Sequence, residues 1–150
     1  MKTKRTLKVT VFTILLLGTM ISCSDSDDSS TEAPLAGNWR VVSIKVSNAT
    51  LAQQASDNED IVIDFDANGE FTGSTSVNQF SGSYETVSDS MTMLSFQTTE
   101  VADTRLGTAF YSSITNAQVP NTTFAQFGFT FDSGNLILFY GDGGEMVLEN

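Results

Sequence analysis

The clearest secondary-structure signal of the chain lies in residues 124–149, which read FAQFGFTFDSGNLILFYGDGGEMVLE. Phe127, Phe129 and Phe131 alternate with small or polar residues, which places the three aromatic rings on one face of a β-strand. A Ser-Gly pair and then a Gly-Asp-Gly-Gly run interrupt the pattern, and each is followed by another strand-forming run. The segment therefore predicts three consecutive antiparallel strands joined by hairpins.

Five segments nearer the N-terminus have the same strand character, because they are rich in β-branched and aromatic residues and are separated by turn residues. The turns include residues 66–69 and 87–90, whose Asn, Asp, Ser and Gly residues favour tight turns. Residues 48–59 are polar, and residues 51–55 within them suggest a short helical turn. The eight predicted strands are residues 39–46, 61–65, 70–76, 79–86, 91–96, 124–132, 136–140 and 145–149.

One segment, residues 101–117, departs from the strand pattern. Leu106, Phe110 and Ile114 recur there every four residues, which puts them on one face of a helix, and Pro120 supplies a stop soon after. The predicted fold is therefore α+β and dominated by β-structure. About eight antiparallel strands form a curled sheet or partial barrel, with one main helix packed against it.

Residues 1–22 have the pattern of a secretory signal, and they precede Cys23, the single cysteine of the chain. A basic start leads into a largely apolar stretch of 13 residues, from Val9 to Ile21. This stretch is too short to span a membrane, which takes about 20 residues. A cysteine at this place resembles the lipobox of bacterial lipoproteins, whose thiol is acylated before cleavage. The resemblance implies a lipid anchor at Cys23 in the bacterial outer membrane, with the protein facing the cell surface or the periplasm.

Residues 23–34 are predicted to be the lipidated cysteine and a disordered acidic tether, because the segment has almost nothing apolar to bury. Asp25, Asp27 and Asp28 resemble the acidic export signals of surface lipoproteins in Bacteroidota. That resemblance favours surface display, while periplasmic retention stays open.

The composition excludes several classes of function. After residue 22 the chain holds all 18 acidic residues and only three basic ones, a net charge of −15. Such a surface repels nucleic acid and anionic headgroups, so membrane attachment is expected through acyl chains. The chain has no histidine, which removes Ser-His-Asp triads, His-ligated zinc and the usual neutral-pH general base. We therefore expect neither an enzyme nor a cofactor, and no nucleic-acid partner.

Asp64 and Asp66 are the remaining candidates for acidic chemistry. Together with Asn68 and Gly69 they match the first half of a calcium-binding loop. The twelfth position of that loop, which should be Glu, is Thr75. We therefore predict a hairpin turn here, and neither a metal site nor a catalytic carboxylate pair.

A succession of short motifs along residues 35–150 contains Gly37, Trp39, Asn78, Phe80, Gly82, Tyr84, Thr98 and Thr99. This succession resembles the META domain family of HslJ-like lipoproteins and secreted proteins. The resemblance implies a compact β-rich domain with one helix, no established catalytic centre and a link to envelope stress. Relatives often carry cysteines at the positions of Val77 and Asp103, so this chain lacks both ends of any disulfide that the family forms there.

These motif residues are expected to be mainly structural. Asn78 can bond to nearby backbone and set a turn, and Gly82 permits a close backbone approach or a bulge. Phe80 and Tyr84 lie an even number of residues apart, so both face the same side of a regular strand.

Three functions of different classes remain open. The first is a non-enzymatic interaction with an unknown protein partner. The second is a lipocalin-like carrier of a small apolar ligand, because Gly37-Asn38-Trp39 has the Gly-x-Trp form of the first lipocalin strand. The third and weakest is a carboxylate-dependent enzyme. Asp89-Ser90-Met91 also resembles a short O-glycosylation sequon, which leaves modification of Ser90 open.

Overall fold

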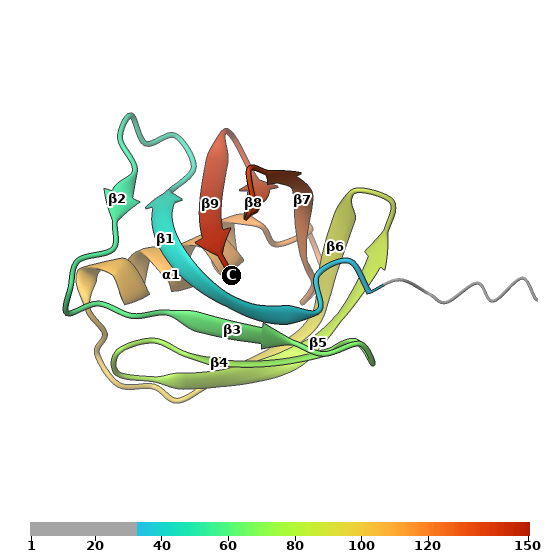
Figure 1. Cartoon of the computed structure of the whole chain (residues 1–150), viewed down its shortest axis with the longest axis horizontal. Helices are drawn as coiled ribbons and strands as arrows, with labels where there is room; N and C mark the ends of the chain where they lie inside the picture. Colours follow the sequence, from blue (N-terminus) through green and yellow to red (C-terminus); the bar gives the residue numbers. More distant parts are fainter. Residues whose placement is uncertain (1–32) are drawn as a thin grey trace, which may run out of the picture. The chain divides into compact units, whose positions relative to one another are not determined.

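Eight strands of the protein close into an antiparallel barrel, and a ninth strand of two residues is added beside β1 (Figure 1). The structure is a computed structural model and describes residues 33–150. The elements are β1 (Gly37–Lys45), β2 (Gln53–Gln54), β3 (Val62–Phe65), β4 (Glu70–Ser74), β5 (Gln79–Val87), β6 (Ser90–Thr98), α1 (Arg105–Asn116), β7 (Ala125–Asp132), β8 (Asn135–Tyr140) and β9 (Gly144–Glu149).

The long, bent strand β1 closes the barrel. Its residues 37–40 pair with β3, and its residues 40–45 pair with β9 on the other edge. The register shifts between Val41 and Ser43, which is a β-bulge. Because the extra residue reverses the alternation, Val41 and Ile44 both lie in the interior although they are three residues apart.

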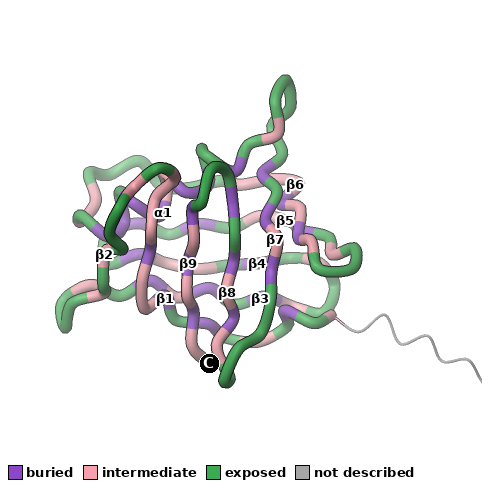
Figure 2. The backbone as a smooth tube through the Cα atoms, turned by 90° about the horizontal axis from the view of Figure 1, so that it is seen from above, coloured by how far each residue is buried: buried purple, intermediate pink, exposed green. Residues whose placement is uncertain are grey.

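The interior of the barrel is filled by side chains. Figure 2 shows buried residues alternating with exposed ones along the strands, as expected when one face of each strand points inward. The rings of Phe80 and Phe110 lie 4.9 Å apart between their centroids, and Phe65 meets Tyr84 edge-on at 5.0 Å. The largest fully buried side chains include Phe65, Phe71, Phe110, Phe127, Ile44, Ile63, Met91, Leu136 and Leu138.

A second bulge lies in β6. Ser83 and Tyr84 of β5 pair with Ser95 and Met93, so Leu94 is the extra residue. Met93 and Phe96 therefore both face the core, where Phe96 stacks on Phe80 with a centroid separation of 5.6 Å. The alternation of β5 itself is undisturbed, and Phe80 and Tyr84 are both buried, as predicted.

The predicted helix is confirmed, with narrower bounds than 101–117. It begins at Arg105 because Thr104 caps it: the Thr104 side chain accepts a hydrogen bond from the N–H of Gly107. The predicted apolar stripe is buried at Leu106, Phe110 and Ile114. The helix lies beside β1, β2 and β7.

All eight predicted strands are present, within a few residues of their expected bounds. The predicted β-dominated antiparallel fold with one helix is confirmed, and its sheet closes fully into a barrel. The helical turn suggested for residues 51–55 is wrong, since Gln53 and Gln54 pair with β1. The three phenylalanines that alternate along β7 differ in burial. Phe127 and Phe129 are buried, but Phe131 is 46% exposed and lies against Trp39. Within residues 33–150, no helix combines the length and apolar character needed to cross a membrane.

Candidate functional site

Asn78 fastens the loop between β6 and α1. Its side chain is 2% exposed and makes four hydrogen bonds to that loop. The amide Nδ2 donates to the carbonyl of Val101 at 2.7 Å and to Oδ2 of Asp103 at 2.8 Å. The amide Oδ1 accepts from Thr99 Oγ1 and from the N–H of Val101, each at 2.9 Å. All four bonding positions of the amide are thus used inside the protein, and the loop is held in one conformation.

Asp103 is the charged member of the same cluster. Besides Asn78, its carboxylate accepts hydrogen bonds from the hydroxyl of Thr75 and the N–H of Thr104. Partial burial opposes ionisation of the carboxyl, but these donors outweigh it, so the pKa of Asp103 lies below its usual value. The Thr75 hydroxyl in turn accepts from the N–H of Asn78 at 2.8 Å, which closes the turn between β4 and β5.

The lowered pKa of Asp103 predicts a contribution to acid stability. Because the folded-state pKa is depressed, ionised Asp103 stabilises the fold fully above its ordinary pKa of about 3.9, and this is lost as the pH falls through the lower folded value. Urea midpoints measured between pH 2 and 6 should fall on acidification. Asp103→Asn should show a shallower fall. An identical pH profile for wild type and variant would contradict this role.

The start of α1 is built around the same carboxylate. A Cβ at Gly107 would lie 2.1 Å from Oδ1 of Asp103, which explains why a helix-disfavouring glycine occupies the first turn. Glu59 also reaches the first turn of the helix and accepts from the N–H of Leu106 at 3.0 Å. That bond, together with the Ser56 hydroxyl, lowers the pKa of Glu59. The carboxylates of Asp103 and Glu59 therefore lie at the N-terminal end of α1, where the helix dipole stabilises negative charge.

A groove runs between this fastened loop and the exposed side of α1. Its first part, about 460 Å³, is lined by Thr98 at the end of β6, by loop residues 99–101 and by helix residues such as Ser112 and Thr115. A second part, about 440 Å³, lies between α1 and the end of β6. Tyr111 lines both parts, and its hydroxyl lies 3.1 Å from Oγ1 of Thr98. We call the two parts together the α1–β6 groove.

The structure brings three of the predicted motif residues together, since Asn78, Thr98 and Thr99 all line the α1–β6 groove. The indole of Trp39, in β1, is buried and donates to the carbonyl of Leu35 at 2.8 Å. Gly37, beside it, has a φ of 146°, which few other residues adopt. These two residues hold the start of the domain and do not line the groove.

The remaining motif residues belong to the barrel wall. Phe80 is buried in the core. A Cβ at Gly82 would lie 2.0 Å from the carbonyl oxygen of Ser95, so the predicted close approach is present opposite the β6 bulge. The hydroxyl of Tyr84 donates to the carbonyl of Asp66 at 2.7 Å. Burial raises the pKa of Tyr84. Cys23 lies outside the described residues.

The acidic turn forms a hairpin between β3 and β4, as predicted. Oδ1 of Asp66 accepts from the N–H groups of Asn68 and Glu70, each at 2.8 Å, so the carboxylate caps the turn. The bond from Glu70 is the main cause of a lowered pKa at Asp66. Among residues 33–150, no three acidic or cysteine side chains converge as a metal site would require.

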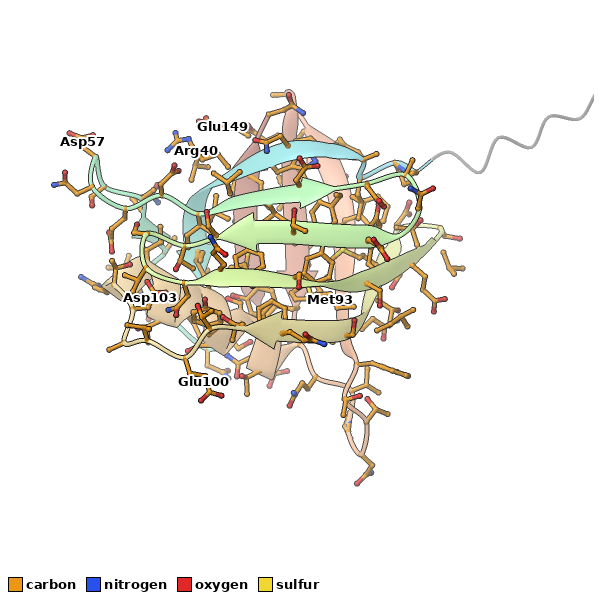
Figure 3. The ribbon with its side chains drawn as sticks, turned by 90° about the horizontal axis from the view of Figure 1, so that it is seen from below. Arg40, Asp57, Met93, Glu100, Asp103 and Glu149 are labelled. Atoms are coloured by element: carbon orange, nitrogen blue, oxygen red, sulfur yellow. The ribbon has the colours of Figure 1, made fainter. Side chains whose placement is uncertain are left out.

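Another hollow, of about 730 Å³, lies on the outer face of β1 and β3 to β6, which Figure 3 views from outside. Its polar side chains lie in cross-strand register on five neighbouring strands. They are Asn38, Asp64, Thr72, Ser81 and Gln97, all exposed. We interpret this surface as an ordinary solvated sheet face, because none of these polar side chains is buried or held in place for a ligand.

Sequence reasoning missed Thr75, Asp103 and Tyr111 as site residues. Asp103 followed by Thr104 is an N-cap signal that would have moved the helix start to the correct place. No local pattern indicated that Asp103 would bond to Thr75 and Asn78, more than 20 residues away. The resemblance gave one pointer, since relatives often carry cysteines at the positions of Val77 and Asp103.

Comparison with one solved structure supports the barrel fold. An NMR structure of a protein from Burkholderia xenovorans is similar with a TM-score of 0.55 and 14% identity, over 75% of this chain and 79% of that one. A crystal structure of an uncharacterized protein from Bacteroides eggerthii gives a TM-score of 0.47 and 14% identity, over 77% of this chain and 98% of the other.

Comparison of the sequence itself gives the family. No curated protein matches the sequence. The sequence model of the META domain matches residues 33–148, which is nearly the whole of the described barrel. The chain therefore belongs to the META domain family.

Proposed function

We propose that this protein is a lipid-anchored, HslJ-like envelope protein that acts by binding a partner and not by catalysis. Cys23 would carry the lipid in the bacterial outer membrane, and residues 23–34 would link it to the barrel. The acidic tether favours the cell surface over the periplasm. The binding surface would be the α1–β6 groove.

The observation that carries this proposal is the fastened loop along the groove. Asn78 and Asp103 hold residues 99–104 by hydrogen bonds, so binding there need not order the loop first. A preorganised surface binds with a smaller entropic cost than a flexible one. The exposed side chain of Val101 and the half-buried ring of Tyr111 add apolar contact area beside hydroxyl groups.

The closed barrel also supports a second candidate, the lipocalin-like carrier, and Gly37-Asn38-Trp39 lies at the start of β1 as in that fold. The packing favours it less. The rings of Phe71, Phe80 and Phe110 lie inside the barrel where a carried ligand would have to sit. Titration with a fluorescent fatty acid should therefore give no saturable one-to-one binding. A saturable isotherm would favour the carrier.

The anchor is tested by metabolic labelling with palmitate. The wild-type chain should incorporate the label and fractionate with membranes, and Cys23→Ser should do neither. Label retained in the Cys23→Ser variant would refute the anchor. Protease treatment of intact cells would then separate surface display from a periplasmic position.

The binding surface is tested by a photo-crosslinking residue placed in the envelope-anchored protein. Thr115 is exposed and lines both parts of the α1–β6 groove, whereas Thr130 is exposed on the outer side of β7. A crosslinker at 115 should give an adduct of discrete mass, and one at 130 should not. Equal adducts from both positions, or none from 115, would contradict a specific surface in the groove.

A further inference from the structure

Two neighbouring strands of the barrel, β6 and β7, are hydrogen-bonded along only part of their length. β6 and β7 pair only where residues 90–93 meet residues 125–128. Beyond Met93, β6 continues to Thr98 and stays paired with β5 on its other edge. On the open side lies the 440 Å³ part of the α1–β6 groove, whose wall includes five consecutive β6 residues, 93–97. We call residues 94–98 the β6 edge.

Backbone groups of the β6 edge point into this groove. Successive residues of an antiparallel strand direct their N–H and C=O groups to opposite sides. The N–H of Thr99 donates to the carbonyl of Gln79 at 3.0 Å, on the β5 side. By alternation Gln97 also faces β5, so the backbone groups of Phe96 and Thr98 face the groove. No strand within residues 33–150 pairs with them there.

We propose that the β6 edge binds an extended peptide, which adds to the barrel as a strand antiparallel to β6. This inference rests on the proposed binding function and names the chemistry of the partner. Phe96 and Thr98 would supply two donors and two acceptors to the peptide backbone. Main-chain bonds give affinity in this mode of recognition, and pockets for alternate side chains give specificity. The peptide would run in the direction of β7, filling the place that β7 leaves empty before Ala125.

The residues that line the groove indicate which side chains such a peptide should carry. Met93, Phe96 and Ile114 form an apolar floor, and the rest of the lining is uncharged. Alternate peptide residues that face this floor should therefore be small or β-branched and apolar. The other residues would face the solvent.

Acidic side chains at one end of the β6 edge indicate which charge the peptide should carry there. Glu100 is exposed and follows the β6 edge, and Asp103 lies close by, whereas Met93 marks the opposite end of the edge (Figure 3). Residues 33–150 hold 14 acidic side chains and three basic ones. In the antiparallel orientation the N-terminal end of the peptide lies beside Glu100, so the partner should carry a lysine or arginine there.

The test uses the isotope-labelled full chain in detergent and a blocked heptapeptide, Lys-Thr-Val-Thr-Val-Thr-Val. The amides of Phe96 and Thr98 should shift on titration and exchange with solvent about tenfold more slowly. A peptide with the same side chains but N-methylated at alternate residues should not bind. A version with Glu in place of Lys should bind about tenfold more weakly, and salt should reduce the difference.

Two variants of Thr98 distinguish the contribution of its backbone N–H to peptide binding from that of its side chain. Thr98→Pro removes the N–H that faces the groove and leaves the bonds of Gln97 and Thr99 to β5 in place, so affinity should fall about tenfold. Thr98→Val removes only the hydroxyl, and affinity should change by about threefold at most. Circular dichroism of both variants checks that the barrel is folded.

Absence of any shift at millimolar peptide, shifts centred on another surface, or equal binding of the N-methylated peptide would overturn the inference. A crosslink from position 115 combined with no peptide binding would leave the proposed function standing and refute only the strand addition. Peptide binding at the β6 edge without any crosslink in the envelope would support strand addition and refute the proposed partner binding in the envelope.

Discussion

Replacing Asn78 by alanine should lower the free energy of unfolding by about 3 kcal/mol, because the change removes the four hydrogen bonds of a buried side chain and leaves their part-buried partners unsatisfied. The N–H of Val101 and the hydroxyl of Thr99 lose their acceptor, and the carboxylate of Asp103 loses a donor. Urea denaturation of the full chain in detergent measures the effect. Hydrogen exchange should also show residues 99–104 opening before the barrel.

The matched control for this change is the next residue, Gln79, which begins β5. Gln79 is exposed, and its side chain takes part in none of the four bonds that fasten the loop. Gln79→Ala should therefore change the stability by about 0.5 kcal/mol or less. Equal losses for the two variants would mean that the Asn78 cluster does not hold the loop.

The variant Asn78→Asp tests whether the contact between residue 78 and Asp103 contributes to stability. It keeps the shape of the side chain but places a second carboxylate where Nδ2 now lies 2.8 Å from Oδ2 of Asp103. Like charges this close cannot both ionise without cost, so the variant should be less stable than wild type at neutral pH. The deficit should shrink as the solution is acidified toward pH 3, because one protonated carboxyl can donate to the other. A deficit that does not depend on pH would exclude this explanation.

Gly82→Ala should also destabilise the protein by about 3 kcal/mol, through overpacking. The added Cβ would lie 2.0 Å from the carbonyl oxygen of Ser95 and 2.6 Å from Cζ of Phe71. Phe71 is 1% exposed and has no room to retreat, and the Ser95 carbonyl belongs to the backbone at the β6 bulge. The strands must therefore separate to admit a methyl group. Thermal and urea unfolding should both report the loss.

Gly128→Ala is the control for Gly82. This glycine also lies in a strand, β7, but the nearest atoms to an added Cβ are 3.9 Å away, at ordinary contact distance. Alanine there should be neutral within about 1 kcal/mol, since it also restricts the unfolded chain. If both glycines tolerate alanine equally, the close approach at Gly82 does not constrain the barrel.

Much of the fold could be predicted because its signals are local. Alternating side chains and turn residues identify each strand without knowledge of its partner, and the spacing of Leu106, Phe110 and Ile114 identifies the helix. The error at residues 51–55 has a tertiary cause. Gln53 and Gln54 are a strand only because β1 extends beyond β3 and offers them an edge.

The candidate site was less predictable than the fold. The motif around Asn78 could be expected to bond to backbone nearby, yet its partners lie in a loop 21 to 25 residues along the chain. The function of Asp103 depends on that contact, and its residue type alone does not reveal it. The α1–β6 groove likewise arises where β7 turns away from β6, which no local pattern records.

By itself the sequence determined the number and order of the main strands, the single helix and the acidic character of the protein. Only the tertiary structure decided that β1 meets β9 and closes the barrel, that Asn78 reaches Asp103, and that one edge of β6 stays unpaired. The physical reason is that side-chain alternation and turn chemistry act between neighbours in the chain. Closure, buried hydrogen bonds and open edges depend on which distant segments meet, and that is fixed only when the whole core packs.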